Sequence, residues 1–172
     1  MRAYQRGDAV AFEQLYRRHR DPVFRYLLRG CSDRERAAEL FQDVWASVIK
    51  ARASWEPRAK FTTWLYRMAH NRLIDDYRLA RLSTEPLEAD MPIAAPEHEQ
   101  PEAAASGAQR LHRVLAAVQG LPFEQREAFL LKEEGGMSLE EIGTATGVGR
   151  ETVKSRLRYA LAKLRQELAD VL

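Results

Sequence analysis

Four acidic residues are the side chains in this sequence best suited to metal-assisted chemistry. Glu39 and Asp43 stand four residues apart, and Asp75 and Asp76 stand next to each other. Carboxylates hold Mg²⁺, so four that converged could support a metal-dependent nuclease. Adjacent residues of a helix, however, point about 100° apart, and the four histidines of the chain lack metal-ligand spacing. The sequence therefore does not favour an enzyme, and we expect neither a metal nor a cofactor.

The pair Glu39 and Asp43 has a second interpretation, as a binding surface. Residues four apart on a helix share one face, and here the apolar residues Leu40, Val44 and Val48 lie beside it. Like charges at this spacing are mildly destabilising, so a partner outside the chain is one explanation. A solvated acidic face is the other, and spacing alone favours it.

Aromatic and basic residues alternate between positions 52 and 78. Rings beside cations suit single-stranded nucleic acid, because bases stack on aromatic side chains at about 1–3 kcal/mol each while cations hold the backbone. A bundle core surrounded by long arginines is the alternative. Trp64 continues a helical stripe with Met68 and is expected in that core, whereas Trp55 lies beside Pro57 in a loop and is expected to be exposed. The segment comprises Arg52, Trp55, Arg58, Lys60, Phe61, Trp64, Tyr66, Arg67, Asn71, Arg72 and Arg78.

The clearest local signal runs from Ser138 to Leu157. Ser138 followed by Glu141 is a capping box, which satisfies two free backbone N–H groups at a helix start. Gly147 supplies the positive φ that a tight turn between crossing helices requires. The pattern is typical of a helix-turn-helix, whose second helix enters the major groove of DNA; a solvated basic face is the alternative. The side chains expected on the DNA-facing side are Arg150, Lys154, Ser155, Arg158 and Tyr159.

Helices must position these side chains, and helical spacing dominates the chain. Apolar residues recur every three to four positions from Ala9 to about Leu82. Asp21-Pro22 resembles a helix start, a further helix follows Ser32-Asp33, and a loop is expected over Ala53–Lys60. Later helices are expected at about 62–80, 108–119, 121–134, 139–146 and 150–169, with no strands. The buried stripe of the last helix is predicted to be Val153, Leu157, Leu161, Leu164 and Leu168.

Residues 83–107 interrupt the helical pattern. They contain Pro86, Pro92, Pro96 and Pro101, and they carry six acids with no lysine or arginine. Such a composition is typical of an extended linker. Residues 1–81 have a charge balance of +7 and residues 108–172 one of +1. The predicted organisation is an N-terminal helical bundle over 1–82, a flexible acidic linker over 83–107 and a helix-turn-helix domain over 108–172.

The cellular compartment is inferred from three features that the sequence lacks: a second cysteine, a signal peptide and a membrane-spanning stretch. Cys31 is the single cysteine, so an internal disulfide is excluded and a reducing compartment is favoured. Met1–Gly7 carries charges without an apolar run, which is unlike a signal peptide. No stretch of about 18 apolar residues occurs, so membrane insertion is not expected. We expect a cytoplasmic protein.

Three blocks of the sequence resemble the extracytoplasmic-function (ECF) sigma factors, the smallest subunits of the sigma-70 family. The resemblance covers nearly the whole chain apart from the linker. It implies an all-α fold in which the N-terminal bundle is sigma region 2 and the helix-turn-helix domain is sigma region 4. Two features depart from the family's pattern, Gly149 at the helix cap and Met68-Ala-His70 where a plainer aliphatic pair is common. They bear on promoter preference rather than on membership. The matching blocks are Ala38–Val44, Phe61–Asn71 with Leu73–Asp75 and Tyr77-Arg78, and Ser138–Leu157.

The resemblance also implies roles for particular residues. A sigma factor binds core RNA polymerase, directs it to the −10 and −35 promoter elements and melts the DNA. Glu39, Asp43 and Val44 would dock on the clamp coiled coil of the polymerase, and the flap is a further expected contact. The C-terminal residues Arg150, Lys154, Ser155, Arg158 and Tyr159 would read the duplex −35 element. The residues expected to hold the melted −10 strand, with Trp55 capturing a flipped base, are Trp55, Arg58, Lys60, Phe61, Asn71 and Arg72.

Two further implications concern partners and alternatives. The resemblance implies that the acidic linker runs through the RNA path of the polymerase, and that an anti-sigma factor holds the protein inactive. A stand-alone helix-turn-helix regulator is the runner-up function. It explains the C-terminal domain equally well, but not the aromatic–basic segment or the acid pair. Such a regulator would bind duplex DNA by itself and ignore polymerase.

Overall fold

The computed structural model describes residues 1–83 and 102–169, and within these two ranges there are eight helices and no strand. The expected all-α fold is confirmed. No helix in the described ranges is long and apolar enough to cross a membrane. The helices are α1 (Arg2–Gln5), α2 (Ala9–Cys31), α3 (Arg34–Lys50), α4 (Phe61–Ser83), α5 (Glu102–Gln119), α6 (Phe123–Glu133), α7 (Leu139–Thr146) and α8 (Arg150–Glu167).

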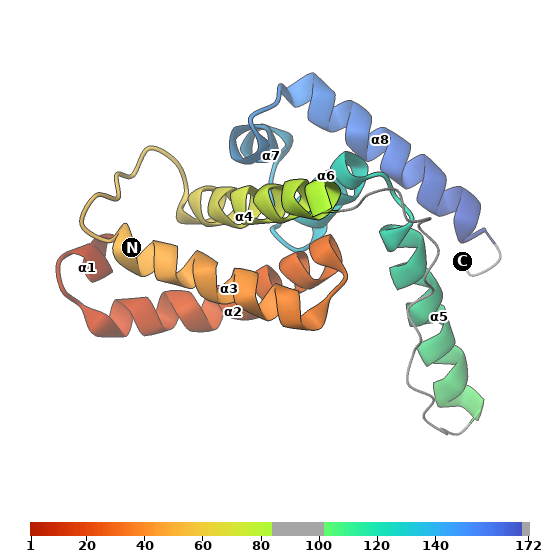
Figure 1. The fold of residues 1–172 in the computed structure, drawn as a ribbon, viewed down its shortest axis with the longest axis horizontal. Helices are drawn as coiled ribbons and strands as arrows, with labels where there is room; N and C mark the ends of the chain where they lie inside the picture. Colours follow the sequence, from red (N-terminus) through yellow and green to blue (C-terminus); the bar gives the residue numbers. More distant parts are fainter. Residues whose placement is uncertain (84–101, 170–172) are drawn as a thin grey trace.

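The helices form two groups that pack against each other (Figure 1). In the N-terminal group α2, α3 and α4 lie side by side, with the short α1 against α2. In the C-terminal group α6, α7 and α8 pack together, and α5 projects away from this group with one end in contact with α8. The groups meet where α7 packs on α4 and α6 packs on α2. The buried apolar residues of both groups therefore form one continuous core.

Helix α2 overturns one prediction, because Asp21-Pro22 does not start a helix. The helix begins after Asp8, whose carboxylate accepts a hydrogen bond from the backbone nitrogen of Ala11 at 3.1 Å, and it continues through Pro22 to Cys31. Proline lacks the N–H that the turn would use and normally bends or breaks a helix. Here Val23 and the two residues after Arg25 are completely buried, and this packing holds the helix together past the proline.

Helices α3 and α4 follow the expected pattern with small shifts at their ends. Asp33 caps α3 by accepting a hydrogen bond from the nitrogen of Arg36 at 2.9 Å. Helix α3 ends at Lys50, so the connecting loop spans residues 51–60 rather than 53–60. Helix α4 begins at Phe61 and ends at Ser83. The loop and the first turns of α4 carry most of the aromatic–basic segment.

The helix-turn-helix is built as its sequence predicts. Ser138 and Glu141 form both hydrogen bonds of the capping box at the start of α7. Gly147 has φ +74 and ends α7, and Gly149 stands at the N-cap of α8. Helix α5 begins at Glu102, six residues before the predicted start. The acidic, proline-containing stretch 84–101 lies outside the described residues, as do the predictions made for it.

The buried stripe of α8 differs from the prediction at one position. Val153, Leu157 and Leu164 are buried, but Leu161 is 41% exposed and Ala160 is completely buried in its place. The spacing of four, three and four residues follows the helical period of 3.6, whereas position 161 is turned by about 100° from that stripe. The small side chain of Ala160 lets α8 lie close to the helices against which it packs.

Candidate nucleic-acid and polymerase interfaces

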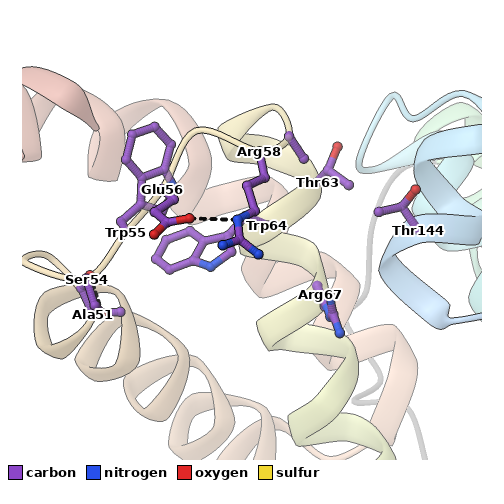
Figure 2. Close-up of a pocket in the computed structure, with 10 residues that line it drawn as sticks. Ala51, Ser54, Trp55, Glu56, Arg58, Thr63, Trp64, Arg67 and Thr144 are labelled. Carbon is purple, nitrogen blue, oxygen red and sulfur yellow. Dashed lines mark hydrogen bonds and ion pairs between the residues drawn. The ribbon is translucent and has the colours of Figure 1, made fainter.

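The loop between α3 and α4 forms one wall of a cavity of about 430 Å³ (Figure 2). The other walls come from the first turns of α4 and from one residue of α7. Aromatic rings, cations and hydroxyl groups all face this space, which is the mixture that base stacking and backbone contacts require. The lining residues are Ala51, Ser54, Trp55, Glu56, Arg58, Ala59, Thr63, Trp64, Arg67 and Thr144.

Trp55 contradicts the expectation that it is exposed. Its side chain is only 7% exposed, and its ring lies edge-on to Trp64 with 6.4 Å between centroids. The loop folds back over the bundle because the side-chain amide of Gln5 donates a hydrogen bond to the carbonyl of Trp55 at 2.9 Å. Trp64 is half-buried, packing on the core and also lining the cavity. The tryptophan pair is thus a wall of the cavity rather than a projecting ring.

Two residues of the cavity wall carry buried polar atoms without a partner. The indole nitrogen of Trp55 and the hydroxyl of Thr63 make no hydrogen bond to any residue that the structure describes. Thr63 is 3% exposed. An unsatisfied buried polar group costs about 1–3 kcal/mol, and the indole nitrogen of Trp45, which does not line the cavity, is in the same state. Sequence reasoning missed Thr63, although it stands in the second block that resembles the ECF sigma factors.

The cations of the segment are placed around this cavity and along α4. Arg67 is exposed at the cavity wall, and Arg58 pairs with Glu56 at 2.6 Å. Arg72 donates to the hydroxyl of Ser47 at 3.3 Å and is only half-exposed. Asn71 is exposed one turn further along α4. Of the remaining predicted residues, Phe61 is half-buried and Lys60 is exposed, outside the residues that line the cavity.

The two acids of the pair on α3, Glu39 and Asp43, have different surroundings. Arg36 donates to Asp76 at 2.5 Å and to Glu39 at 2.6 Å, and these bonds raise the pKa of the guanidinium. Glu39 and Asp76 therefore converge on an arginine. Asp43 is exposed and has no ion pair within the described ranges. Its charge is the one left available to a partner.

Val44 is a correction to the predicted polymerase surface. Its side chain is completely buried between the helices of the bundle. A helical period of 3.6 turns position 44 about 100° from position 43. Val44 therefore packs the core and cannot contact another protein, whereas Glu39 and Asp43 are exposed.

The turn of the helix-turn-helix depends on a second glycine that sequence reasoning did not single out. A Cβ atom at Gly143 would lie 2.7 Å from the carbonyl oxygen of Val148, which is closer than real Cβ contacts allow. The backbone nitrogens of Gly147 and Val148 both donate to the carbonyl of Gly143, at 2.9 and 3.2 Å. Gly143 therefore lets the turn fold tightly over α7 and sets the direction of α8.

The predicted DNA-facing residues lie at the start and middle of α8 and are mostly exposed. Arg150 pairs with Glu140 at 2.6 Å and Glu151 at 2.8 Å, and these contacts raise the pKa of its guanidinium. Lys154 is exposed with only a 3.8 Å contact to Glu151. Arg158 lies over the exposed ring of Tyr159, 5.0 Å from its centroid, and Ser155 is half-exposed. These five residues therefore all lie in the first ten residues of α8.

Comparison with known proteins identifies both halves of the chain. The family described as "Sigma-70 region 2" matches residues 15–82 of this chain. The family described as "Sigma-70, region 4" matches residues 111–164. The ECF RNA polymerase sigma factor RpoE of Cereibacter sphaeroides is 32% identical to this chain, over 94% of the chain and 88% of that relative. The chain belongs to the ECF sigma factors of the sigma-70 family. This sigma factor is also 31% identical to the RNA polymerase sigma factor CarQ of Myxococcus xanthus, over 99% of the chain and 97% of that relative.

Solved structures of sigma factors share the fold. CnrH, solved in complex with the cytosolic domain of CnrY, matches with a TM-score of 0.70 and 24% identity, over 96% of this chain and 92% of that chain. The sigma factor RpoE of Bartonella quintana, solved with the anti-sigma factor NepR, matches with a TM-score of 0.74 and 21% identity, over 92% and 97% of the two chains. The predicted family, its helical region 2 and region 4 and the role of this sigma factor in directing transcription initiation are confirmed.

Proposed function

We propose that the cavity between Trp55 and Trp64 holds an unpaired base of the −10 element when this sigma factor works with core RNA polymerase. The cavity itself supports this proposal most directly, because the rings of Trp55 and Trp64 line it together with the guanidinium of Arg67. A base offers ring and carbonyl acceptors that an N–H or hydroxyl can reach. The exposed guanidinium of Arg67 beside the cavity suits the phosphates of the same strand.

Promoter melting then needs no covalent step. A base can enter the cavity only after it has left the duplex, so binding favours the open form of the promoter over the closed one. Unstacking and unpairing a base costs a few kcal/mol, and stacking on aromatic side chains returns about 1–3 kcal/mol for each base held. Arg58, Lys60, Phe61, Asn71 and Arg72 would hold the rest of the strand. We therefore propose that this sigma factor is not an enzyme.

The exposed face of α8 is proposed to read the duplex −35 element. A helix-turn-helix presents the first turns of its second helix to the major groove. Lysine and arginine there reach guanine acceptors or phosphates, and serine can contact either. Residues 1–82 and 108–172 would act as two DNA-reading domains, joined by the acidic segment 83–107. The proposed contacts are Arg150, Lys154, Ser155, Arg158 and Tyr159.

Asp43 is proposed to dock on the clamp coiled coil of the polymerase, with Glu39 beside it. Asp43 is exposed and has no ion pair within the described ranges, so a cation from a partner would meet a free carboxylate. Glu39 would contribute less to this contact, because its carboxylate already accepts a hydrogen bond from Arg36. Region 4 would make the second contact, on the flap. A cytoplasmic location and control by an anti-sigma factor fit this role.

Co-purification with core polymerase tests the proposal against its runner-up. The purified chain is mixed with core enzyme and passed over a size-exclusion column, with and without promoter DNA. A sigma factor co-elutes with core polymerase in the absence of DNA. A stand-alone regulator would bind duplex DNA alone and elute apart from polymerase, and that result would reject the proposal.

A further inference from the structure

Helix α1 lies at the end of the N-terminal bundle where the 51–60 loop leaves α3 (Figure 1). The ring of Tyr4 is buried and packs on Phe12, with 4.8 Å between centroids. Phe12 in turn meets Trp45 edge-on at 5.9 Å. A four-residue helix is too short to be stable by itself. Its position is therefore set by Tyr4, which anchors it to the aromatic side chains of α2 and α3.

The turn between α1 and α2 fixes the direction of the short helix. Gly7 has φ +108, a conformation that glycine adopts without strain. The backbone nitrogens of Gly7 and Asp8 donate to the carbonyls of Tyr4 and Ala3, at 3.0 and 3.1 Å respectively. Asp8 is also the N-cap of α2. The last residues of α1 are therefore held against the start of a long helix, and this places the side chain of Gln5 beside the 51–60 loop.

Gln5 joins this anchored helix to the backbone of the loop. Its side-chain amide nitrogen donates to the carbonyl of Trp55 at 2.9 Å and to the carbonyl of Ala53 at 3.3 Å. Among the residues that the structure describes, no other side chain from outside the loop donates to a carbonyl of this loop. One amide group thus holds the backbone on both sides of Ser54.

Arg52 makes a second contact between α1 and the loop. Its guanidinium lies over the ring of Tyr4, 4.8 Å from the centroid. A cation in this position is attracted by the negative face of the ring. Tyr4 and Gln5 are neighbours in the sequence, and they contact the loop near its start and at its middle. Helix α1 therefore restrains the first half of the loop at two places.

The loop has few contacts of its own that would hold Trp55 in place. Residues 53, 54 and 56–60 are exposed, and the hydroxyl of Ser54 donates only to a carbonyl at the start of the same loop, at 3.3 Å. A segment with so few contacts opens easily. The ring of Trp55 nevertheless forms a wall of the cavity next to Trp64 (Figure 2). Where this wall stands therefore depends on the backbone that Gln5 holds.

We propose that Gln5 is a positioning residue for base selection: by holding the carbonyl of Trp55, it sets the width of the cavity and so the base that the cavity accepts. This inference rests on the proposed function of the cavity. Gln5 is not among the lining residues, so it acts through Trp55 and does not touch the DNA. A preformed cavity favours the base that fits it, because no ordering of the loop is needed on binding. Without Gln5 the loop moves, and all four bases are accepted more evenly.

The mobility of the loop tests the restraint by Gln5 directly. A spin label is attached at Ala53→Cys, which is exposed and outside the cavity lining, in a full-length Cys31→Ser background. Gln5→Met keeps the length of the side chain but removes the donor, so the label should move faster and its spectrum should narrow. Gln5→Lys retains a donor and should reverse the change. Gln14→Met, at an exposed position of α2, is the matched control. Equal mobility in Gln5→Met and the parent would overturn the proposal.

Base selection is then measured with the unlabelled variants as holoenzymes, by sequencing the transcripts made from a promoter library randomised across both elements. With Gln5→Met, the preference at the captured −10 position should fall about fivefold, the equilibrium factor of one net hydrogen bond. Preferences at the other −10 positions and at the −35 element should not change, and Gln5→Lys should restore the lost preference. A purely structural role would lower all transcripts alike and leave every preference as it was, which would overturn the proposal.

Trp64→Phe separates a failure of this inference from a failure of the proposed function. This change alters a wall of the cavity directly, so it should shift the base preference at whichever −10 position the cavity holds. If Trp64→Phe shifts one position and Gln5→Met leaves that position unchanged, the cavity captures a base but Gln5 does not position it. If Trp64→Phe shifts no position, the proposed function of the cavity fails and the role of Gln5 fails with it.

Discussion

Lys60 of region 2 and Glu141 of region 4 form an ion pair with 2.8 Å between Nζ and Oε1. The other carboxylate oxygen of Glu141 accepts a hydrogen bond from the backbone nitrogen of Ser138 at 2.9 Å. The contact with Lys60, followed by that with Ser138, holds the pKa of Glu141 below its ordinary value. One carboxylate therefore caps α7 and also ties it to the loop before α4.

Glu141→Gln should lower stability in a way that depends on pH. Because the folded-state pKa of Glu141 is depressed, its ionised form stabilises the fold above the unfolded pKa, and that stability is lost as pH falls through the folded pKa. Glutamine can still accept from Ser138, so we expect a loss of about 1 kcal/mol near pH 7. Urea unfolding at pH 7 and at pH 3.5 measures it. The deficit should shrink at the lower pH; an equal deficit at both, or the same deficit in the exposed control Glu133→Gln, would contradict the assignment.

Asp43→Arg should abolish binding to core polymerase while leaving the fold intact. Asp43 is exposed, so its replacement disturbs no packing, but the reversed charge repels the cation that the carboxylate is proposed to meet. Co-elution with core enzyme and thermal unfolding together measure the effect. Asp75→Arg, an equal charge change at an exposed position on α4, is the control and should bind normally. Normal transcription by the Asp43 variant would refute the proposal that Asp43 belongs to the polymerase-binding surface.

Thr63→Val should make the free protein more stable and the promoter harder to open. Valine keeps the shape of threonine and removes a buried hydroxyl that lacks a partner among the described residues, which should add about 1 kcal/mol of stability. The same hydroxyl is proposed to contact the captured base, so open-complex formation should fall several-fold. Chemical denaturation and permanganate reactivity of unpaired thymines report the two effects. Stability gained without any loss of opening would remove Thr63 from the proposed site.

Lys154→Ala should weaken holoenzyme binding to promoters that depend on the −35 element. Removing one DNA-contacting cation should cost roughly tenfold in affinity and lower the slope of log affinity against log salt by about 1. Filter binding over a range of salt concentrations measures both quantities. Arg165→Ala removes an equal charge from the last turn of α8 and is the control. An identical effect of the two changes would show general electrostatics rather than a contact at the start of the helix.

Sequence patterns predicted the structural features that depend only on residues close together in the chain. The capping box at Ser138, the positive φ of Gly147 and the cap at Asp33 are each fixed within a few positions, and each is found. Two predictions about positions that depend on tertiary packing were wrong. Pro22 lies inside a helix because buried neighbours hold that helix together, and Trp55 is buried because its loop folds over the bundle.

The contact between the two regions could not be predicted from local patterns. His70 drew attention as a departure from the family's sequence pattern, with a consequence expected for promoter preference. In the structure it contacts Glu127, which is far from it in sequence. Each residue taken alone is an ordinary polar position on a helix. The pairing arises only from how α6 packs on α2 and α4, which no periodicity within either helix contains.

Transcription by purified core polymerase with this chain on a library of promoter sequences, with permanganate mapping of the unpaired region, tests the central claim most directly. The account predicts that transcripts start only when chain and core are both present. They should start downstream of a shared pair of −10 and −35 motifs, with unpaired thymines at the −10 element. Duplex binding by the chain alone, with no polymerase-dependent transcripts and no unpaired thymines, would contradict it.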